Sequence, residues 1–285
     1  MKPKRFALPG RSANGKICFP APTEACIQCS WKAATIMSYK VGETNWYDKF
    51  TPEQKAEAHR KPWLKEGIGS MLADAGAIIS LLPAPPLDVL DAGCAEGYLA
   101  HILSLCGYRV TAADVCEAVL DKSRQMAVRW NELVSTPNFV VMDFDHLPEN
   151  RWDAIIFASA LHHSMDRRAT LASCFKALRP GGVLMASEPG IGHGSGQHAR
   201  EWSAKMDVTE KSTPPYGIAK DGRSVGFQSI RVYPNPATLH KAAYQVSGLG
   251  HHPLVKAVAS LPVGVAAVAA AKWFHGLTVM HKPQR

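Results

Sequence analysis

Three aspartates in this chain of 285 residues each close a short apolar run, and such a pattern could bind a ligand. Asp91, Asp114 and Asp143 stand at the ends of three successive runs of this kind. Because the carboxyl ends of parallel strands meet at one edge of a sheet, we expect the three carboxylates to share a common rim. Carboxylates placed there suit ribose hydroxyls and positive charge, so the pattern indicates a nucleotide-type ligand.

The turn after Asp91 favours close approach of a ligand to the backbone. Gly93 and Gly97 carry no Cβ, and a helix expected from about Tyr98 to Leu105 points its first amide groups at the same place. The spacing D-x-G-x-x-x-G differs from the dinucleotide fingerprint G-x-G-x-x-G. An ordinary tight turn between a strand and a helix is the alternative interpretation.

In the stretch from Val89 to Gly97 the chain resembles the class I S-adenosylmethionine-dependent methyltransferases, whose first motif is (V/L)LD-x-G-x-G-x-G. Ala95 stands where that family often has its middle glycine, and we expect Ala95 to keep a negative φ. The resemblance implies S-adenosylmethionine as cofactor, S-adenosylhomocysteine as product, and an acid or its neighbour after the third strand at the adenine amino group. The expected cofactor-binding residues are Asp91, Gly93, Cys94, Ala95, Gly97, Asp114, Val115, Asp143, Phe144 and Ala158.

Alternating strand and helix patterns predict an α/β fold, a Rossmann-like sheet of seven strands with helices on both faces. In the family the last strand runs antiparallel between the fifth and the sixth. The segment 177–182 resembles the LxPGG turn before the fifth strand in the small-molecule branch, and we expect a turn there. The expected strands are 87–90, 109–114, 138–143, 152–157, 183–187, 229–234 and 276–282.

The chain divides into an N-terminal arm with cap helices, residues 1–82, and a methyltransferase domain, residues 83–285. Thr51, Pro52 and Gln54 predict a capping box at the start of one cap helix. Two insertions are expected to act as a substrate lid. The first, residues 191–228, is glycine-rich and contains one expected helix at 198–206, and the second, residues 236–273, is helical.

The second insertion carries an apolar stripe that Lys256 and Pro262 interrupt, which is too short for a transmembrane span. Core packing, peripheral membrane contact and dimer packing all remain open for it. The stripe consists of Leu254, Val258, Leu261, Val265 and Val268.

The net charge of +8 is unevenly distributed along the chain. Lys and Arg number 12 against 5 Asp and Glu in residues 1–65, 9 against 15 in residues 66–190, and 11 against 4 in residues 191–285. An acidic centre suits a cationic cofactor, and basic flanks suit an anionic acceptor, a nucleic acid or an acidic membrane, beside the alternative of a solvated surface.

The cysteines and the amino-terminal residues bear on metals and on compartment. Cys26 and Cys29 form a single C-x-x-C with no second pair, so we expect no metal site. No apolar run follows the basic residues 1–5, and the seven cysteines are an odd number. We therefore expect a cytoplasmic protein with free thiols.

The expected reaction is in-line methyl transfer to a small-molecule or saccharide acceptor at oxygen, with positioning as the main contribution of the protein. His162, His163 and Glu188 are the candidate catalytic residues, and His193 and His198 are further candidates for a base. RNA methylation and a non-catalytic protein that binds S-adenosylmethionine are alternatives, although no amino-methylating Asn/Asp-Pro-Pro-Tyr motif follows the fourth strand. An NAD-dependent reductase shares the fold class, and titration with both cofactors separates the two.

Overall fold

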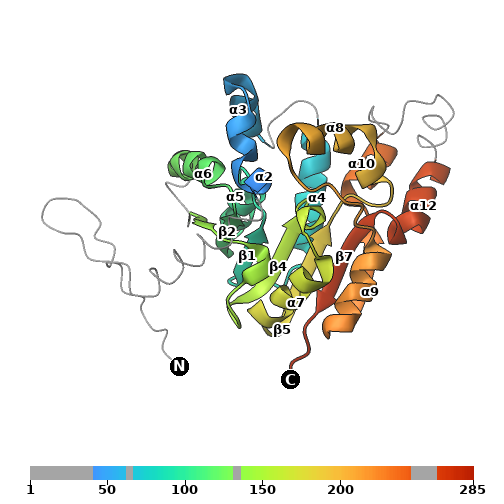
Figure 1. Cartoon of the computed structure of the whole chain (residues 1–285). Coiled ribbons are helices and arrows are strands. Elements are labelled where there is room, and N and C mark those ends of the chain that lie inside the picture. The colour runs from blue at the N-terminus through green and yellow to red at the C-terminus, as the bar shows by residue number, and fades with distance from the viewer. Residues whose placement is uncertain (1–40, 62–66, 131–135, 245–261) are drawn as a thin grey trace, which may run out of the picture.

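A seven-stranded sheet forms the centre of the protein (Figure 1). The structure is a computed structural model, which describes residues 41–61, 67–130, 136–244 and 262–285. The strand order is β3-β2-β1-β4-β5-β7-β6, and β7 runs antiparallel to both of its neighbours. This arrangement confirms the expected Rossmann-like sheet. The strands are β1 (Asp88–Ala92), β2 (Arg109–Asp114), β3 (Asn138–Val141), β4 (Trp152–Ala158), β5 (Leu178–Ser187), β6 (Gln228–Pro234) and β7 (Gly276–His281).

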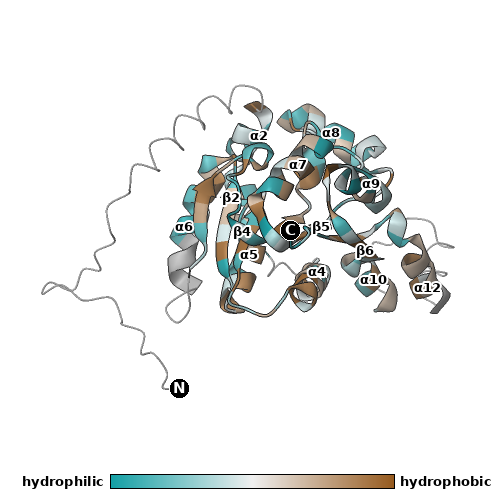
Figure 2. Ribbon diagram, turned by 90° about the horizontal axis from the view of Figure 1, so that it is seen from below, coloured by the Kyte–Doolittle hydropathy of each residue, from teal (hydrophilic) through white to brown (hydrophobic). Residues whose placement is uncertain are grey.

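The central strands are apolar on both sides because helices cover both faces of the sheet. In β4, Ile156 packs in one hydrophobic core and Ile155 and Phe157 pack in the other. Helices α4 (Ile68–Leu81), α5 (Tyr98–Leu105) and α6 (Glu117–Trp130) cover the first face. Helices α7 (Arg167–Ala177) and α9 (Pro215–Val225) lie on the opposite face (Figure 2).

The end of β3 and the start of β5 differ from the expected boundaries. β3 ends at Val141, and Asp143 instead caps the short helix η2 (Phe144–His146) by accepting a hydrogen bond from the amide of Asp145 at 2.9 Å. The expected turn at 177–182 is wrong as a boundary, since β5 already begins at Leu178. The glycine turn is absorbed as an irregularity in the pairing with β4, with Gly181 at a φ of +77°.

The first insertion contains a helix that the glycine-rich sequence did not predict. Helix α8 (Gln197–Met206) agrees with the expected one, but residues 215–225 form α9. Ile218 of α9 is fully buried in the same core as Met280 of β7. The part of the expected lid that forms α9 therefore covers the sheet, and the segment before it, residues 191–214, contributes to the cavity at the carboxyl ends of the strands.

The described part of the N-terminal region is a cap made of α2 (Val41–Asn45), η1 (Trp46–Lys49) and α3 (Pro52–Ala58). The predicted capping box is confirmed: Thr51 Oγ1 accepts from the amide of Gln54 at 3.2 Å, and Gln54 Oε1 accepts from the amide of Thr51 at 2.9 Å. The Cys26 and Cys29 pair lies outside the described residues.

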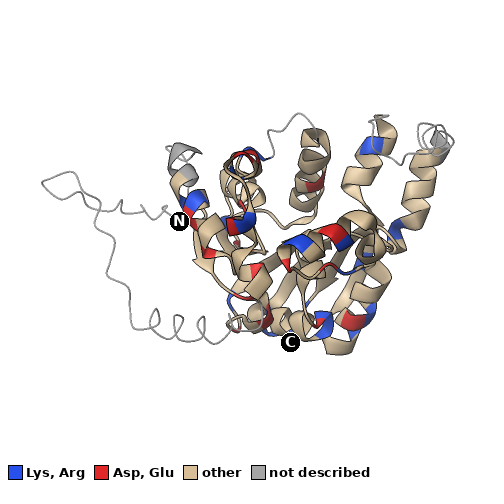
Figure 3. Ribbon diagram, turned by 45° about the horizontal axis from the view of Figure 1, so that its top comes forward, with Lys and Arg blue, Asp and Glu red and all other residues tan. Residues whose placement is uncertain are grey.

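The second insertion contributes α10 (Pro236–Ala243), which lies beside α4, then α12 (Pro262–Ala270) and η5 (Ala271–Trp273). Three members of the apolar stripe, Leu254, Val258 and Leu261, lie outside the described residues. Within the described part of the chain, no helix has the length and apolar character to cross a membrane. Lys and Arg lie among Asp and Glu on several helices of that part (Figure 3).

The return into β7 depends on a close approach at Gly276, and this gives a test of the fold. A Cβ at Gly276 would overlap the carbonyl oxygens of Lys272 and Tyr233, so we expect Gly276→Ala to lower the free energy of unfolding by about 1–3 kcal/mol. Exposed Gly76 of α4 has no neighbour within 4 Å of that position, and Gly76→Ala should raise stability by roughly 0.5–1 kcal/mol. Denaturant unfolding of both variants measures the difference, and equal effects would contradict the packing at Gly276.

Candidate functional site

A cavity of about 300 Å³ lies at the carboxyl ends of the strands. Its walls come from the strand ends, from the cap and from residues 191–214 between β5 and α9, which we call the lid segment. Six of the residues expected in the site line it: Gly93, Ala95, Asp114, Val115, Phe144 and His163. Sequence reasoning missed Glu43, Trp46, Phe50, Lys61, Glu96, Ser159, Ala160, Trp202 and Val208.

The turn between β1 and α5 forms the floor of the cavity. The amides of Gly93 and Cys94 both donate to the carbonyl of Ala113 on β2, at 2.8 and 2.9 Å. Gly93 has a φ of +72°, and a Cβ there would lie 2.5 Å from Cβ of Ala160. Gly97 has a φ of +75°, and a Cβ there would lie 2.5 Å from Phe139 Cε1. Both glycines are therefore required by conformation and by space.

The expectation for Ala95 is wrong, since its φ is +46° and not negative. The left-handed region is unfavourable for alanine, at a cost of roughly 1–2 kcal/mol. The amide of Ala95 donates to Asp114 Oδ2 at 2.9 Å, and this hydrogen bond to a buried carboxylate offsets part of the cost. A middle glycine would adopt the same turn without strain.

Asp114 joins the end of β2 to this turn and faces the cavity. Its Oδ2 accepts from Ala95 and its Oδ1 accepts from the amide of Cys116 at 2.9 Å. Burial raises the pKa of Asp114 to about 6, although the two amides oppose that rise. A carboxylate held at both oxygens in the cavity wall is a rigid acceptor for ligand hydroxyls.

The other two aspartates do not line the cavity, so the common rim of three carboxylates is not formed as expected. Asp91 is buried on the face of the sheet that α5 covers, and burial raises its pKa to about 7. Among the described residues, Asp91 Oδ2 has no hydrogen-bond partner. Asp143 is buried at the cap of η2, while its neighbour Phe144 reaches the cavity.

The cap and the lid supply an aromatic wall. The rings of Trp46 and Phe50 have centroids 5.1 Å apart, and Phe50 lies 5.8 Å from Trp202 of α8. Lys61 Nζ contacts both carboxylate oxygens of Glu96 at 3.1 Å, which ties the cap to the β1–α5 turn. Trp46, Phe50, Lys61 and Trp202 lie far from the glycine turn in sequence, and only the density of aromatic residues near position 46 indicated a packed arm.

The candidate catalytic residues occupy two different environments. His163 lines the cavity, and its Nδ1 lies 2.5 Å from the carbonyl oxygen of Thr209 in the lid segment. Glu188 is buried and accepts from the amides of Ala160, Leu161 and His162, and from His162 Nδ1 at 2.8 Å. Although burial alone would raise the pKa of Glu188, His162 and these amides lower it below its usual range. His162 and Glu188 do not line the cavity.

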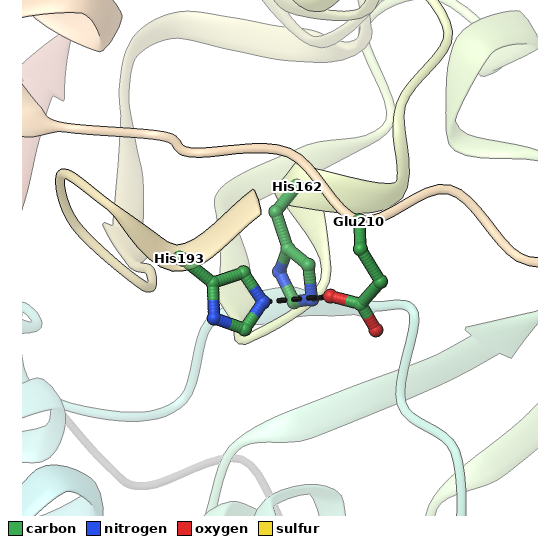
Figure 4. Close-up of side chains that lie close together, drawn as sticks. All are labelled: His162, His193 and Glu210. Atoms are coloured by element: carbon green, nitrogen blue, oxygen red, sulfur yellow. Dashed lines mark hydrogen bonds and ion pairs between the residues drawn. The ribbon is translucent and has the colours of Figure 1, made fainter. Parts of the chain in front are cut away.

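A second cluster lies beside His163. Nε2 atoms of His162 and His193 lie 3.5 and 2.6 Å from Glu210 Oε2, so the two imidazoles converge on one carboxylate oxygen (Figure 4). No short spacing links residues 162, 193 and 210, and the sequence therefore did not indicate Glu210. His198, a further candidate for a base, is exposed, and its ring stacks on Trp202 at 5.9 Å. Of the remaining expected residues, Cys94, Gly97 and Ala158 lie next to lining residues.

A family model described as a methyltransferase domain matches residues 90–186, from β1 through most of β5. This segment contains the glycine turn and the strand ends described above. The chain carries a class I S-adenosylmethionine-dependent methyltransferase domain.

Curated relatives of this methyltransferase domain are about 30% identical to it over the aligned residues. A protein of Mycolicibacterium smegmatis, named a probable S-adenosylmethionine-dependent methyltransferase, is 32% identical over 106 residues, which are 36% of this chain and 38% of the relative. A malonyl-[acyl-carrier protein] O-methyltransferase of Serratia marcescens is 30% identical over 44% of this chain and 45% of its own length. A ubiquinone/menaquinone biosynthesis C-methyltransferase of Shewanella halifaxensis is 30% identical over 54% of this chain and 63% of its own length. The chain thus spans less than two thirds of each of these relatives.

Solved structures share the fold of the methyltransferase domain. A methyltransferase in complex with the Haloferax volcanii Trm112 methyltransferase activator has a TM-score of 0.54 at 16% identity, over 84% of this chain and 97% of the other. An S-adenosylmethionine-dependent methyltransferase from Mesorhizobium loti has a TM-score of 0.51 at 16% identity, over 73% of this chain and 96% of the other. At such identities the likeness concerns the fold alone.

The cofactor of this methyltransferase domain is S-adenosylmethionine, and the residues of the cavity fit it. The cradle at Gly93 would be filled by a Cβ, and Asp114 offers a buried acceptor for ribose hydroxyls.

The raised pKa of Asp91 predicts a pH dependence of stability. The unfolded carboxyl has a pKa of about 3.9, so the folded protein holds more protons between about pH 4 and 7. The contribution of Asp91 to stability is therefore most favourable below that window and falls as pH rises through it, by up to about 1.4 kcal/mol per pH unit. Thermal unfolding of the free protein from pH 5 to 8 should show this decline, and Asp91→Asn should reduce it.

Asp88 of the same strand is a matched control for Asp91. Ion pairs with Arg109 and Arg179 lower the pKa of Asp88 to about 2, so it stays ionised over the whole range. Asp88→Asn should lower stability equally at every pH from 5 to 8. The same pH dependence of stability in the wild type and in Asp91→Asn would contradict the buried, protonated state of Asp91.

The glycine cradle predicts the outcome of a substitution on cofactor binding. In Gly93→Ala the new Cβ would meet Ala160, and we expect the dissociation constant for S-adenosylmethionine to rise at least about tenfold, or 1.4 kcal/mol. Gly107, between α5 and β2, also has a positive φ of +93°, but its nearest neighbour to a Cβ is Pro85 at 3.6 Å. Gly107→Ala should therefore carry a similar backbone strain and keep the affinity. Calorimetric titration of both variants measures the dissociation constant. An unchanged affinity in Gly93→Ala would show that the cofactor does not bind at this glycine.

Proposed function

We propose that this chain transfers the methyl group of S-adenosylmethionine to a hydroxyl oxygen of a small-molecule or saccharide acceptor. The observation that carries the proposal is the cavity of the methyltransferase domain, which Gly93 of the glycine cradle, Asp114 and His163 all line. Named relatives at about 30% identity include O-methyltransferases, which supports oxygen as the methylated atom.

Bound S-adenosylmethionine supplies an electrophilic methyl group, whose bond to sulfur breaks, with the electron pair kept by sulfur, as the acceptor oxygen bonds to the carbon. The residues of the chain mainly position the reactants. Positioning of this kind contributes roughly 7–11 kcal/mol in favourable systems. The aromatic wall of Trp46, Phe50 and Trp202 excludes water from one side of the cavity.

His163 is the residue that we assign as the proton acceptor for the hydroxyl. Its Nδ1 lies 2.5 Å from the carbonyl of Thr209, which can only accept, so Nδ1 carries a proton and Nε2 is the atom that accepts one when the ring is neutral. His163 is also the member of the three expected catalytic residues that lines the cavity. His162, in the loop after β4, and Glu188, which follows β5, act behind it as positioning residues.

RNA methylation receives no support from the described residues. Lys and Arg residues there lie among Asp and Glu residues along several helices (Figure 3). Much of the basic N-terminal flank lies outside the described residues. A small acceptor also agrees better with a cavity of about 300 Å³ than a folded RNA does.

Release of S-adenosylhomocysteine in the presence of hydroxylated acceptors tests the function, and His163→Gln tests the assignment of the base. We expect kcat to fall by roughly 10²–10⁴ in His163→Gln, because the hydroxyl loses its proton acceptor, while the affinity for S-adenosylmethionine stays within a factor of three. His281→Gln is the matched control and should keep full activity. His281 pairs with Val183 of β5, at the end of the strands away from the cavity.

Two results would contradict these assignments separately. An unchanged kcat in His163→Gln would remove this residue as the base and leave methyl transfer intact. Binding of S-adenosylmethionine without product release from any oxygen, nitrogen or carbon acceptor would favour a non-catalytic binding protein.

A further inference from the structure

Three side chains beside the cavity present nitrogen and oxygen atoms to one point. His162 comes from the loop after β4, His193 from the short helix η4 (His193–Ser195), and Glu210 from the segment between α8 and α9. One nitrogen from each histidine and one oxygen of Glu210 all lie within 4.8 Å of one another (Figure 4). From this convergence we propose that His162, His193 and Glu210 form a binding site for a divalent first-row transition cation.

The separations need only a small adjustment to hold such an ion. Zinc bonds of about 2.0–2.1 Å at tetrahedral angles place neighbouring ligand atoms roughly 3.3 Å apart. His162 Nε2 already lies 3.5 Å from Glu210 Oε2, and His193 Nε2 lies at 2.6 Å from the same oxygen. These two separations differ from that spacing by less than about 1 Å, and the side chain of His193, which is 27% exposed, has room to adjust.

A hydrogen bond at the second ring nitrogen fixes the orientation of His162, as is usual for histidines that bind metals. Its Nδ1 donates to Glu188 at 2.8 Å, and this carboxylate also accepts three backbone amides. The contact directs Nε2 toward Glu210 and His193. A carboxylate that orients the second nitrogen of a histidine is a common second layer around bound metals.

The backbone around the cluster is also held in place. The amide of Gly194 donates to Ser212 Oγ at 3.1 Å, and the amide of Lys211 donates to the carbonyl of His162 at 3.3 Å. A Cβ at Gly194 would lie 2.8 Å from the carbonyl oxygen of Glu210, so the two segments meet closely. Ligands on segments tied in this way are positioned before an ion arrives.

The donor set selects the class of cation. Two imidazole nitrogens and one carboxylate oxygen suit Zn²⁺, Co²⁺, Ni²⁺ or Fe²⁺, whereas Mg²⁺ and Ca²⁺ prefer oxygen ligands. Glu43, whose Oε1 lies 3.6 Å from His163 Nδ1, and Glu188 add negative charge next to the cluster. Three protein ligands leave at least one coordination position open, as at catalytic sites.

A metal-free cluster that merely joins the lid segment to the loop after β4 is the alternative. It would explain the contact between His193 and Glu210, but it would give the protein no affinity for cations. Metal binding itself distinguishes the two, and it requires neither S-adenosylmethionine nor an acceptor. Its outcome is therefore independent of the proposed methyl transfer.

The test is a Co²⁺ titration of the full chain after treatment with a chelator and dialysis. We expect one equivalent to bind, with the visible absorption of a Co²⁺ site of low coordination number, and Zn²⁺ to displace it. His193→Ala and Glu210→Gln should each weaken binding at least about tenfold, as loss of a ligand does. Calorimetric titration with S-adenosylmethionine should show that both variants still fold.

His198→Ala is the matched control, since His198 is exposed on the same lid segment but stacks on Trp202. It should bind Co²⁺ like the wild type. Failure of the wild type to bind one equivalent would overturn the proposal. The same would follow if all variants bound alike, or if His198→Ala lost the ion, because surface histidines would then explain the binding.

Discussion

The site depends on the attachment of the β1–α5 turn to the end of β2. The amides of Gly93 and Cys94 donate to the carbonyl of Ala113, and the amide of Ala95 donates to the side chain of the next residue, Asp114. These contacts fix the backbone of three successive residues of the turn at the floor of the cavity. They also hold Ala95 in a left-handed conformation that alanine does not favour. The floor of the cavity and its buried carboxylate therefore form one unit, which requires that β1 and β2 be parallel neighbours.

Much of the fold could be predicted from the sequence because its signals are local. Apolar runs that end in Asp91 or Asp114, with a helix pattern between them, specify a parallel sheet with helices on both faces. Helix α9 was missed because Pro214, Pro215 and Gly217 suggest an irregular loop. The proline at the first helical position instead starts the helix, and the burial of Ile218 stabilises it. Tertiary packing decided that segment, and its local composition did not.

The site was predicted less completely, for two physical reasons. Successive side chains of a strand point to opposite faces of the sheet, so the face that an aspartate occupies depends on its exact position. The pattern that located Asp91 therefore could not show that its side chain points under α5. The second reason is distance along the chain. Trp46, Lys61 and Trp202 lie far from the glycine turn in sequence, and only tertiary structure brings Lys61 to Glu96 and Trp202 to Phe50.

The segment that carries Glu210 couples the two halves of the site. The amide of Thr209 donates to Glu43 Oε1 of the cap at 2.7 Å, and the carbonyl of Thr209 contacts His163. Lys211 Nζ donates to the carbonyls of Ser164 and Met165, at 3.0 and 2.7 Å. A change in the position of Glu210 would therefore be transmitted to the residues that border the cavity. Since Glu210 contacts both imidazoles of the cluster, a cation held there would stabilise the closed arrangement of cap, lid segment and loop after β4.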